Sequence, residues 1–251
     1  MRRILVVLLT LAIFAGLASL VFAKPDRSFR IPSSAQKVSE SVYYLGKAAN
    51  GAEGYAFLRY TDGFARPGGG SAKAPKCYAF MAKGARWKNT ESYVTDIENP
   101  ATETSLETWD SEVSFEIFGS RDSTYLGILE ADVVSPDDKN ELYYGAIEEP
   151  GVIGVTIVWG YFYGPTFSRE LIEWDMILDN VDFAWGDADQ EPTRMDYQNI
   201  LTHELGHSAG MADLYTSSCT EETMYGYATE GETKKRTLNS GDITGIKELY
   251  R

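Results

Sequence analysis

The sequence predicts an α+β fold in which strands fill the first part of the chain and helices close it. Short runs rich in aromatic and β-branched residues alternate with turn residues between positions 78 and 178. An apolar stripe at helical spacing begins near Pro192-Thr193, and another runs from Gly241 to Tyr250. Strands followed by helices in this order are typical of an α+β domain.

One helix interrupts the strand-rich part. From Thr102 to Val113, Leu106 and Trp109 recur at helical spacing, so we expect a helix with its apolar stripe turned inward. Thr193 is the expected N-cap of the next helix, and Ser240 is the expected cap of the last one. The expected strands are 78–83, 86–97, 115–118, 125–134, 142–147, 152–163 and 170–178.

The first 23 residues predict an export signal or a membrane anchor. A basic start, Met1-Arg2-Arg3, precedes an apolar run from Ile4 to Phe22, with small residues before a cleavage point after Ala23. The run is nearly long enough to span a bilayer, so an uncleaved anchor is the alternative. We therefore expect the rest of the chain to be secreted or held at the outer face of the membrane.

Residues 24–76 are expected to form an N-terminal extension, either a pro-segment or a wrap around the main domain. Ser39–Leu45 and Tyr55–Tyr60 could each be a short strand or a helical turn. Residues 61–76 are rich in glycine and proline, which marks a linker or an exposed loop. What precedes this loop is too short for a core of its own, so we place one domain at residues 77–251.

The chain is acidic, with 37 Asp and Glu against 23 Lys and Arg and a formal net charge of −14 at pH 7. This balance argues against a nucleic-acid-binding role, because phosphates need a basic surface. We interpret the acidity as a solvated surface that favours solubility. Bound Ca²⁺ is a further candidate cofactor for some of these carboxylates.

The two cysteines, Cys77 and Cys219, are far apart and have no zinc-ligand spacing. In an exported protein such a pair is expected to form a disulfide, which here would join the start of the main domain to a loop near the chain's end. The alternative is that Cys77 binds a metal as a thiolate in a latent form of the protein.

One stretch reads H-E-L-G-H-S-A-G-M-A-D and holds the only two histidines of the sequence. On a helix, His203 and His207 lie four residues apart on one face and can bind the same ion. Neutral imidazoles at this spacing are standard zinc ligands, and Glu204 between them is placed to act as a base. Gly210 can stop the helix and turn the chain sharply, so that Asp213 comes back as the third ligand.

This motif resembles the zinc-binding sequence of the metzincins, and Thr223-Met224-Tyr225-Gly226 resembles their Met-turn. The tail after Leu238 is similar to the closing helix of the matrixins. Cys77-Tyr78 and the residues after it are similar to the entry strand of archaeal and bacterial matrixin-like proteases. The resemblance covers residues 77–251.

The resemblance implies a secreted zinc endopeptidase with a metzincin-like catalytic domain. In that fold a twisted mixed sheet lies above a long active-site helix, and the Met-turn and a C-terminal helix lie below. Met224 would lie beneath a catalytic Zn²⁺ held by His203, His207 and Asp213, without binding it. Glu204 would take a proton from the attacking water and pass it to the leaving amine.

The resemblance also implies where a peptide or protein substrate binds. An edge strand above the cleft would pair with the substrate backbone, and the expected edge is Val155, Thr156, Ile157 and Val158. The pocket for a substrate side chain is expected on the loop from Gly226 to Arg236.

The sequence departs from the family pattern at two positions. Asp213 replaces the usual third histidine, and Gly226 stands where some metzincins carry a tyrosine; we assign no catalytic role to Tyr225 or Tyr227. The P-R-C-G-x-P-D switch of matrixin pro-segments is also absent from the sequence.

Two other interpretations stay open. An H-E-x-x-H peptidase of the gluzincin type would take its third ligand from a later glutamate, and the candidates are Glu221, Glu222, Glu230 and Glu232. A zinc-stabilised extracytoplasmic binding or adhesion module would bind the metal without turnover. The base Glu204 argues against such a module, because structural zinc sites need no base and are usually closed by four ligands.

Overall fold

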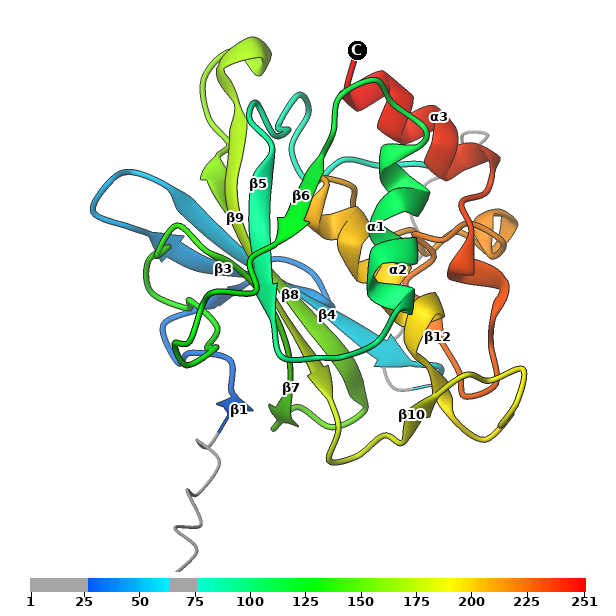
Figure 1. Ribbon diagram of the computed structural model, residues 1–251. Coiled ribbons are helices and arrows are strands. Elements are labelled where there is room, and N and C mark those ends of the chain that lie inside the picture. The colour runs from blue at the N-terminus through cyan, green and yellow to red at the C-terminus, as the bar shows by residue number, and fades with distance from the viewer. Residues whose placement is uncertain (1–26, 64–75) are drawn as a thin grey trace, which may run out of the picture.

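The structure is a computed structural model that describes residues 27–63 and 76–251 (Figure 1). The expected export signal or anchor at residues 1–23 and most of the expected linker at 61–76 lie outside these described residues. No helix in the described part of the chain is long and apolar enough to cross a membrane.

Ten strands form one mixed sheet within the described residues. They are β1 (Ser28–Phe29), β2 (Gln36–Lys37), β3 (Val42–Lys47), β4 (Glu53–Thr61), β5 (Glu91–Thr95), β6 (Phe118–Arg121), β7 (Asn140–Ile147), β8 (Val152–Tyr161), β9 (Glu170–Asp179) and β12 (Tyr227–Ala228). The main order is β2-β3-β4-β8-β9-β7-β5-β6, with β1 beside β7 and β12 beside β4. Neighbours from β2 to β9 in this order are antiparallel, and neighbours from β9 to β6 are parallel.

Helices lie to one side of this sheet (Figure 1). The α-helices are α1 (Ala101–Asp110), α2 (Tyr197–Ser208) and α3 (Ser240–Leu249). The 3₁₀ turns are η1 (Thr166–Ser168), η2 (Ser217–Cys219) and η3 (Lys234–Arg236). A separate pair of short strands is formed by β10 (Trp185–Gly186) and β11 (Met195–Asp196). The helix α1 packs on α2, and the Trp109 indole donates a 2.7 Å hydrogen bond to the carbonyl of Thr202. Trp109 is fully buried, as expected for a core residue. The mixed sheet and the separate helices confirm the predicted α+β, metzincin-like fold.

Apolar side chains cover both faces of the sheet. One cluster lies between the sheet and the helices and includes Trp174, Ile200 and Leu205. A second cluster on the opposite face includes Leu58 and Trp159. The strand β8 is buried on both faces and its sequence is a nearly continuous apolar run, which made it predictable. The strand β9 was predictable from the alternation of apolar residues such as Trp174 and Met176 with Glu173 and Asp175, although these acids are buried too.

The N-terminal extension is part of the sheet. The strand β4 pairs with β8 over its length, from Glu53 opposite Gly160 to Tyr60 opposite Val152. Its residue Leu58 is 1% exposed and lies in the second cluster. The strands before residue 62 therefore share a core with the rest of the described chain, as a wrap around the main domain would. The expected division of the chain at residue 76 stays a prediction.

Two expected strands are wrong. Residues 78–83 make only an isolated bridge, because their backbone binds the turn that follows α2. Residues 125–134 form a loop over the sheet, and the amide of Asp132 donates to the buried carboxylate of Asp175 at 2.7 Å. Apolar content alone does not distinguish a strand from a loop packed in this way. The strands expected at 86–97 and 115–118 become the shorter β5 and the shifted β6.

Two expected N-caps are also wrong. The helix α2 begins after Asp196 and not after Thr193, because Oδ1 of Asp196 accepts a 2.8 Å hydrogen bond from the third helical amide. The helix α3 begins after Asn239, and Ser240 is its first residue. Asn239 and Asp242 form a capping box there, which satisfies two of the amides that a helix N-terminus leaves open.

Candidate metal centre

The helix α2 carries three of the predicted site residues in the middle of the molecule. His203 and Glu204 are 0% exposed and His207 is 1% exposed. Two tryptophan side chains hold the helix through its backbone. The Trp109 indole donates a hydrogen bond to the carbonyl of Thr202, and the Trp87 indole donates one to that of Ser208 at 2.8 Å. A helix held at two carbonyls in this way gives its histidines a fixed direction.

The turn after α2 brings Asp213 back to the histidines. Gly210 has φ = +100°, a left-handed conformation that side chains rarely adopt, and a Cβ there would lie 2.8 Å from the carbonyl oxygen of Ala85. The amide of Met211 binds the carbonyl of Gly206 at 2.8 Å, which closes the helix. The predicted role of Gly210 as the residue that ends the helix is confirmed.

The histidine rings are oriented by backbone carbonyls. Nδ1 of His203 lies 2.6 Å from the carbonyl oxygen of Thr223, and Nδ1 of His207 lies 3.1 Å from that of Met211. A carbonyl only accepts, so each Nδ1 carries a proton, and in the neutral form of each ring Nε2 keeps a lone pair. Both lone pairs point to Oδ1 of Asp213, which lies 3.2 Å from Nε2 of His203 and 3.4 Å from Nε2 of His207.

The three side chains fit a metal ion. Nε2 of His203 and Oδ1 of Asp213 are buried and lack a hydrogen-bond partner. The ligand atoms of His203, His207 and Asp213 all lie within 4.8 Å of one another. Unpaired buried polar atoms cost ~1–3 kcal/mol each, and a cation at their centre would pair them. Two imidazoles and one carboxylate suit Zn²⁺ and leave a fourth position open.

Burial and neighbouring charges set the protonation of these ligands. Burial holds the pKa of His203 well below its usual value, and the positive charge of Arg59 adds to the effect, so this imidazole is neutral. Burial lowers the pKa of His207 as well, but the charge of Asp213 outweighs it and raises that pKa. Burial alone would raise the pKa of Asp213, but the two histidines hold it well below its usual range. Zinc binds neutral imidazole and ionised carboxylate, so His203 and Asp213 are ready to bind, and the ion would displace a proton held on His207.

Glu204 lies beside this group with one oxygen occupied and one free. Its Oε2 accepts a 2.6 Å hydrogen bond from the hydroxyl of Thr156 on β8, while its buried Oε1 has no partner. Burial raises the pKa of Glu204, although the charges of His207 and Arg59 oppose the rise. A carboxylate with a raised pKa and a free oxygen is a better proton acceptor than an ordinary glutamate.

Two further side chains at the site were not indicated by any sequence pattern. Oδ2 of Asp213 lies 3.1 Å from the hydroxyl of Tyr215 and 3.3 Å from that of Ser41, which precedes β3. These hydroxyls hold the carboxylate that would bind the metal. Tyr215 also fills the space beside Gly226, where an added Cβ would lie 2.3 Å from the Tyr215 ring. Only the position of Tyr215, two residues after the motif, could have suggested it.

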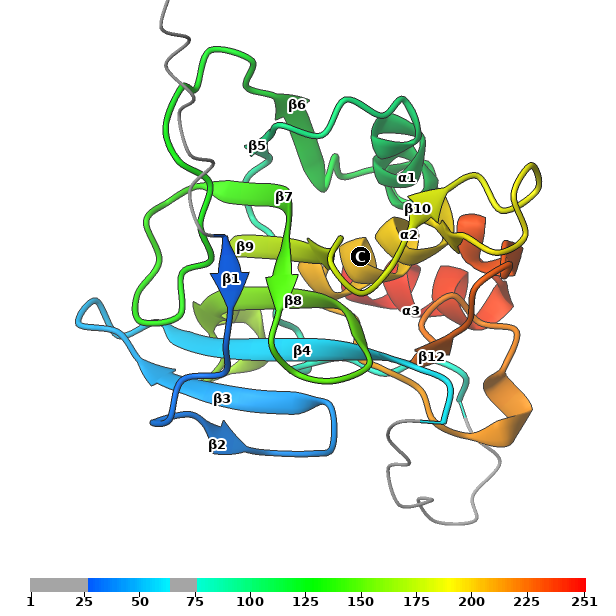
Figure 2. The same cartoon turned by 90° about the horizontal axis from the view of Figure 1, so that it is seen from below.

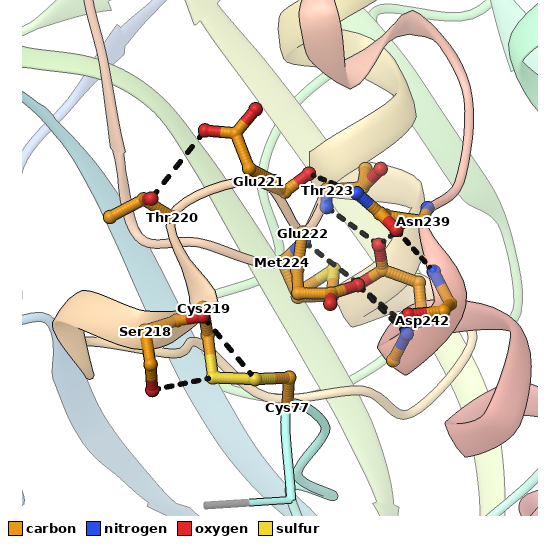
Figure 3. The surroundings of a disulfide bond; sticks show 12 residues. Cys77, Ser218, Cys219, Thr220, Glu221, Glu222, Thr223, Met224, Asn239 and Asp242 are labelled. Carbon is orange, nitrogen blue, oxygen red and sulfur yellow. Dashed lines mark hydrogen bonds between the residues drawn. A yellow bond between two sulfur atoms is a disulfide. The ribbon is translucent and has the colours of Figure 1, made fainter.

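Met224 lies against α2, on the side where the Met-turn was expected. It is fully buried, and a Cβ at Gly206 would lie 2.2 Å from its sulfur, so only glycine fits at this point of the helix. The carboxylate of Asp242 on α3 binds the amides of Thr223 at 2.6 Å and Met224 at 3.1 Å (Figure 3). The Met-turn is thus tied to the C-terminal helix.

The predicted disulfide between Cys77 and Cys219 is confirmed. Their sulfurs are 2.06 Å apart and their Cα atoms 5.4 Å apart (Figure 3). The alternative role of Cys77 as a thiolate on the metal is wrong for this structure, because its sulfur is bonded to Cys219.

The expected substrate edge is not an edge. Val155, Thr156, Ile157 and Val158 lie in β8, which pairs with β9 on one side and with β4 on the other. The prediction of an unpaired edge is wrong because the N-terminal extension supplies a strand there.

Two of the glutamates that the gluzincin alternative would use as third ligand are engaged elsewhere. Glu222 accepts from the amide of Gly241 at 2.9 Å, and Glu232 pairs with Lys235. Asp213 is the carboxylate that the structure groups with the two histidines.

A second group of side chains could hold a cation in the described residues. Asp132, Glu173 and Asp175 bring their carboxylates within 4.8 Å of one another under the 125–134 loop. Burial raises the pKa of Asp132 to about 6 and that of Glu173 to about 8, and it raises that of Asp175 strongly. The sequence raised Ca²⁺ as a candidate cofactor without indicating these residues.

Comparison with known proteins supports the resemblance. Residues 162–251 match the model of the matrixin family, peptidase family M10, a match that runs from the end of β8 through α2 and Met224 to the end of α3. The resemblance to a matrixin-like metzincin is confirmed over residues 162–251, and it supports a zinc metallopeptidase in general. The match does not reach β4 or the strands up to β8. No curated protein matches the sequence.

Proposed function

We propose that this matrixin-like chain is an exported endopeptidase that cleaves peptide bonds with one zinc ion and Glu204. The observation that carries the proposal is the convergence of three buried ligand atoms, two of them without hydrogen-bond partners, beside a carboxylate with a free oxygen. His203, His207 and Asp213 would hold the ion. When bound, zinc supplies Lewis-acid chemistry, which activates water and polarises a carbonyl.

The residues of the chain then provide the proton transfers. Oε1 of Glu204 accepts a proton from the attacking water, and the carboxyl group later donates it to the nitrogen of the leaving amine. Thr156 holds Oε2 at 2.6 Å, and Oε1, which has no partner, is left to accept the proton. The raised pKa of Glu204 suits both steps, because the group must gain and lose a proton within one turnover.

Export is supported by the sequence of residues 1–23 and by the disulfide. Cys77–Cys219 needs an oxidising compartment to form and persist. Mass spectrometry of the exported protein would identify its N-terminus. A terminus after Ala23 supports a cleaved signal, and an intact Met1 would instead support a membrane anchor.

A zinc-stabilised binding module without turnover is the second candidate, and one observation favours it. The histidines and Glu204 are at most 1% exposed, so no substrate can reach them in this conformation. The test is incubation with casein over hours, with and without a chelator. Cleavage that stops with the chelator and returns with added zinc is expected; bound zinc without any cleavage would support the binding module.

A further inference from the structure

The metal group is covered by the chain's own strand β4. Its residue Phe57 stacks on the ring of His207, with the ring centroids 4.5 Å apart. Its residue Arg59 is 1% exposed and acts on Glu204 and Asp213 through its charge. The cover therefore touches one metal ligand directly and lies beside the proposed base.

Two other strands hold β4 in an extended conformation. It runs antiparallel to β8, with Phe57 opposite Thr156 and Arg59 opposite Gly154, and its end runs parallel to β12, which follows the Met-turn (Figure 2). Thr156 is the residue that binds Glu204. A single extended segment is thus bound through its backbone to the strand above the metal group and to the segment below it. A peptide that added a strand between the same two segments would cross the metal group in the same extended conformation.

Side-chain alternation divides the residues of β4 between two sides. Residues two apart on a strand share a face, so Phe57 and Arg59 both point to the metal side, while Leu58 points into the cluster on the opposite face. The two peptide bonds between Phe57 and Arg59 are therefore the ones that span the metal group. Arg59 lies on the carboxyl-terminal side of these bonds.

The guanidinium of Arg59 lies in a buried pocket that binds its two Nη atoms and leaves Nε without a partner. Its Nη1 and Nη2 lie 3.3 Å from the carbonyl oxygens of Tyr225 and Tyr227, respectively. The negative charge of Glu232 also acts on it. Two carbonyl oxygens in contact with a planar, multiply donating group, with a carboxylate charge nearby, favour arginine over an aliphatic or acidic side chain. Tyr227 and Glu232 lie on the loop Gly226–Arg236, where the sequence placed the substrate pocket, and Tyr225 directly precedes this loop.

The buried Lys235 shares this pocket without excluding a second cation. Its Nζ donates to the carbonyl of Tyr227 at 2.8 Å and pairs with Glu232. Burial, together with the charge of Arg59, lowers the pKa of Lys235 to about 7. The lysine can therefore lose its charge when a guanidinium is present.

We infer that β4 is an internal pseudosubstrate, and that the enzyme cleaves peptides that place an arginine in the Arg59 pocket, as the first or second residue after the cleaved bond. This inference rests on the proposed peptidase function. It follows that β4 must leave β8 before a substrate can bind, so the parent protein cleaves its substrates slowly. The alternative is that β4 never leaves β8.

The first test compares Arg59→Ala and Arg59→Lys with the parent. Arg30→Ala is the matched control, because Arg30 is an exposed arginine of the same extension, paired with Glu148. Loosening β4 raises the fraction of molecules in which β4 has left β8 and a substrate can bind. Arg59→Ala should therefore cleave casein at least about tenfold faster than the parent. Arg59→Lys should fall between these two, and Arg30→Ala should equal the parent. Equal rates in all four proteins would overturn the inference.

The second readout is the sequence of the products. Mass spectrometry of fragments from a mixture of unfolded proteins should find arginine enriched, by about fivefold or more, at the first or second position of new N-termini. Fragments from the parent and from Arg59→Ala should show the same preference. New termini without arginine enrichment contradict the inference even if the rates change as expected.

The third test locks the strand and does not depend on a buried arginine variant folding. Ala56 and Ile157 are opposite each other on β4 and β8, so Ala56→Cys/Ile157→Cys can form a cross-strand disulfide. The oxidised protein should lose at least about tenfold in activity and regain it on reduction. The parent under the same reductant controls for Cys77–Cys219. An oxidised protein as active as the parent would show that β4 need not move.

The failure of the inference can be distinguished from failure of the proposed function. Glu204→Gln placed in the Arg59→Ala background should abolish cleavage. If chelator and Glu204→Gln both remove activity but arginine is not enriched, only the pseudosubstrate inference fails. If no variant shows chelator-sensitive cleavage, the peptidase proposal fails and the inference fails with it.

Discussion

The tie between the Met-turn and the last helix gives a stability prediction for Asp242→Ala. In the parent, the Asp242 carboxylate accepts from the amides of Thr223, Met224 and Asn239, at 2.6, 3.1 and 3.1 Å (Figure 3). Asp242 and the residues of the turn, Thr223 and Met224, are buried. Alanine leaves the two turn amides without a partner and removes the capping box of α3.

The magnitude follows from these contacts. Two buried amides without partners cost ~1–3 kcal/mol each, ~2–6 kcal/mol together. Alanine also removes a buried carboxyl whose pKa burial raises to about 6, which offsets part of the loss. We therefore expect the lower end, ~2–3 kcal/mol, which corresponds to ~4–12 °C in Tm for a chain of this length.

The assay is equilibrium unfolding in urea at pH 7, followed by tryptophan fluorescence. Glu107→Ala is the control, because Glu107 is an exposed residue of α1, and surface changes of this kind stay within ~0.5 kcal/mol. Asp242→Asn, which keeps one acceptor oxygen, should fall between Asp242→Ala and the parent. The reasoning is refuted if Asp242→Ala and Glu107→Ala unfold at the same urea concentration.

Three further predictions test the acidic group, the third ligand and the disulfide. Burial raises the pKa of Glu173 from 4.5 to about 8, so the folded protein holds this proton more tightly than the unfolded chain, and stability should fall as pH rises between these values. In thermal melts with chelator, Glu173→Gln should make stability depend less steeply on pH, and a slope equal to that of the parent contradicts the prediction. Asp213→His replaces a charged ligand by a neutral one, so water bound to the metal should lose its proton more easily. The acid limb of the pH–rate profile should then move to lower pH, and a move to higher pH would refute this. Reducing Cys77–Cys219, which closes a loop with a sequence separation of 142, should cost about 5 kcal/mol in urea unfolding in the chain-entropy model, and no shift of the midpoint would contradict it.

The sequence predicted the metal group well because its geometry is local. Spacing on one helix brings His203 and His207 together, and Gly210 alone is enough to return Asp213 to them. The pairing of Cys77 with Cys219 was also predictable, since no third cysteine competes.

The cover over the site was not predictable, because its contacts are long-range. Nothing in the alternation of β4 shows that it pairs with β8 about a hundred residues later, or that Arg59 reaches Tyr225 and Tyr227. Ser41 likewise meets Asp213 only in the folded chain. The N-cap at Asp196 was missed because Thr193 offered a similar local signal, and only the folded backbone selects between them.

The most direct test of the central claim is a paired measurement on Glu204→Gln: bound zinc and casein cleavage in the same preparation. If His203, His207 and Asp213 hold the metal and Glu204 moves the proton, the variant keeps the zinc content of the parent and cleaves slower by ~10²–10⁴-fold. A variant that cleaves as fast as the parent, or that loses its zinc, would contradict the assignment of Glu204 as a base beside an independent three-residue metal site.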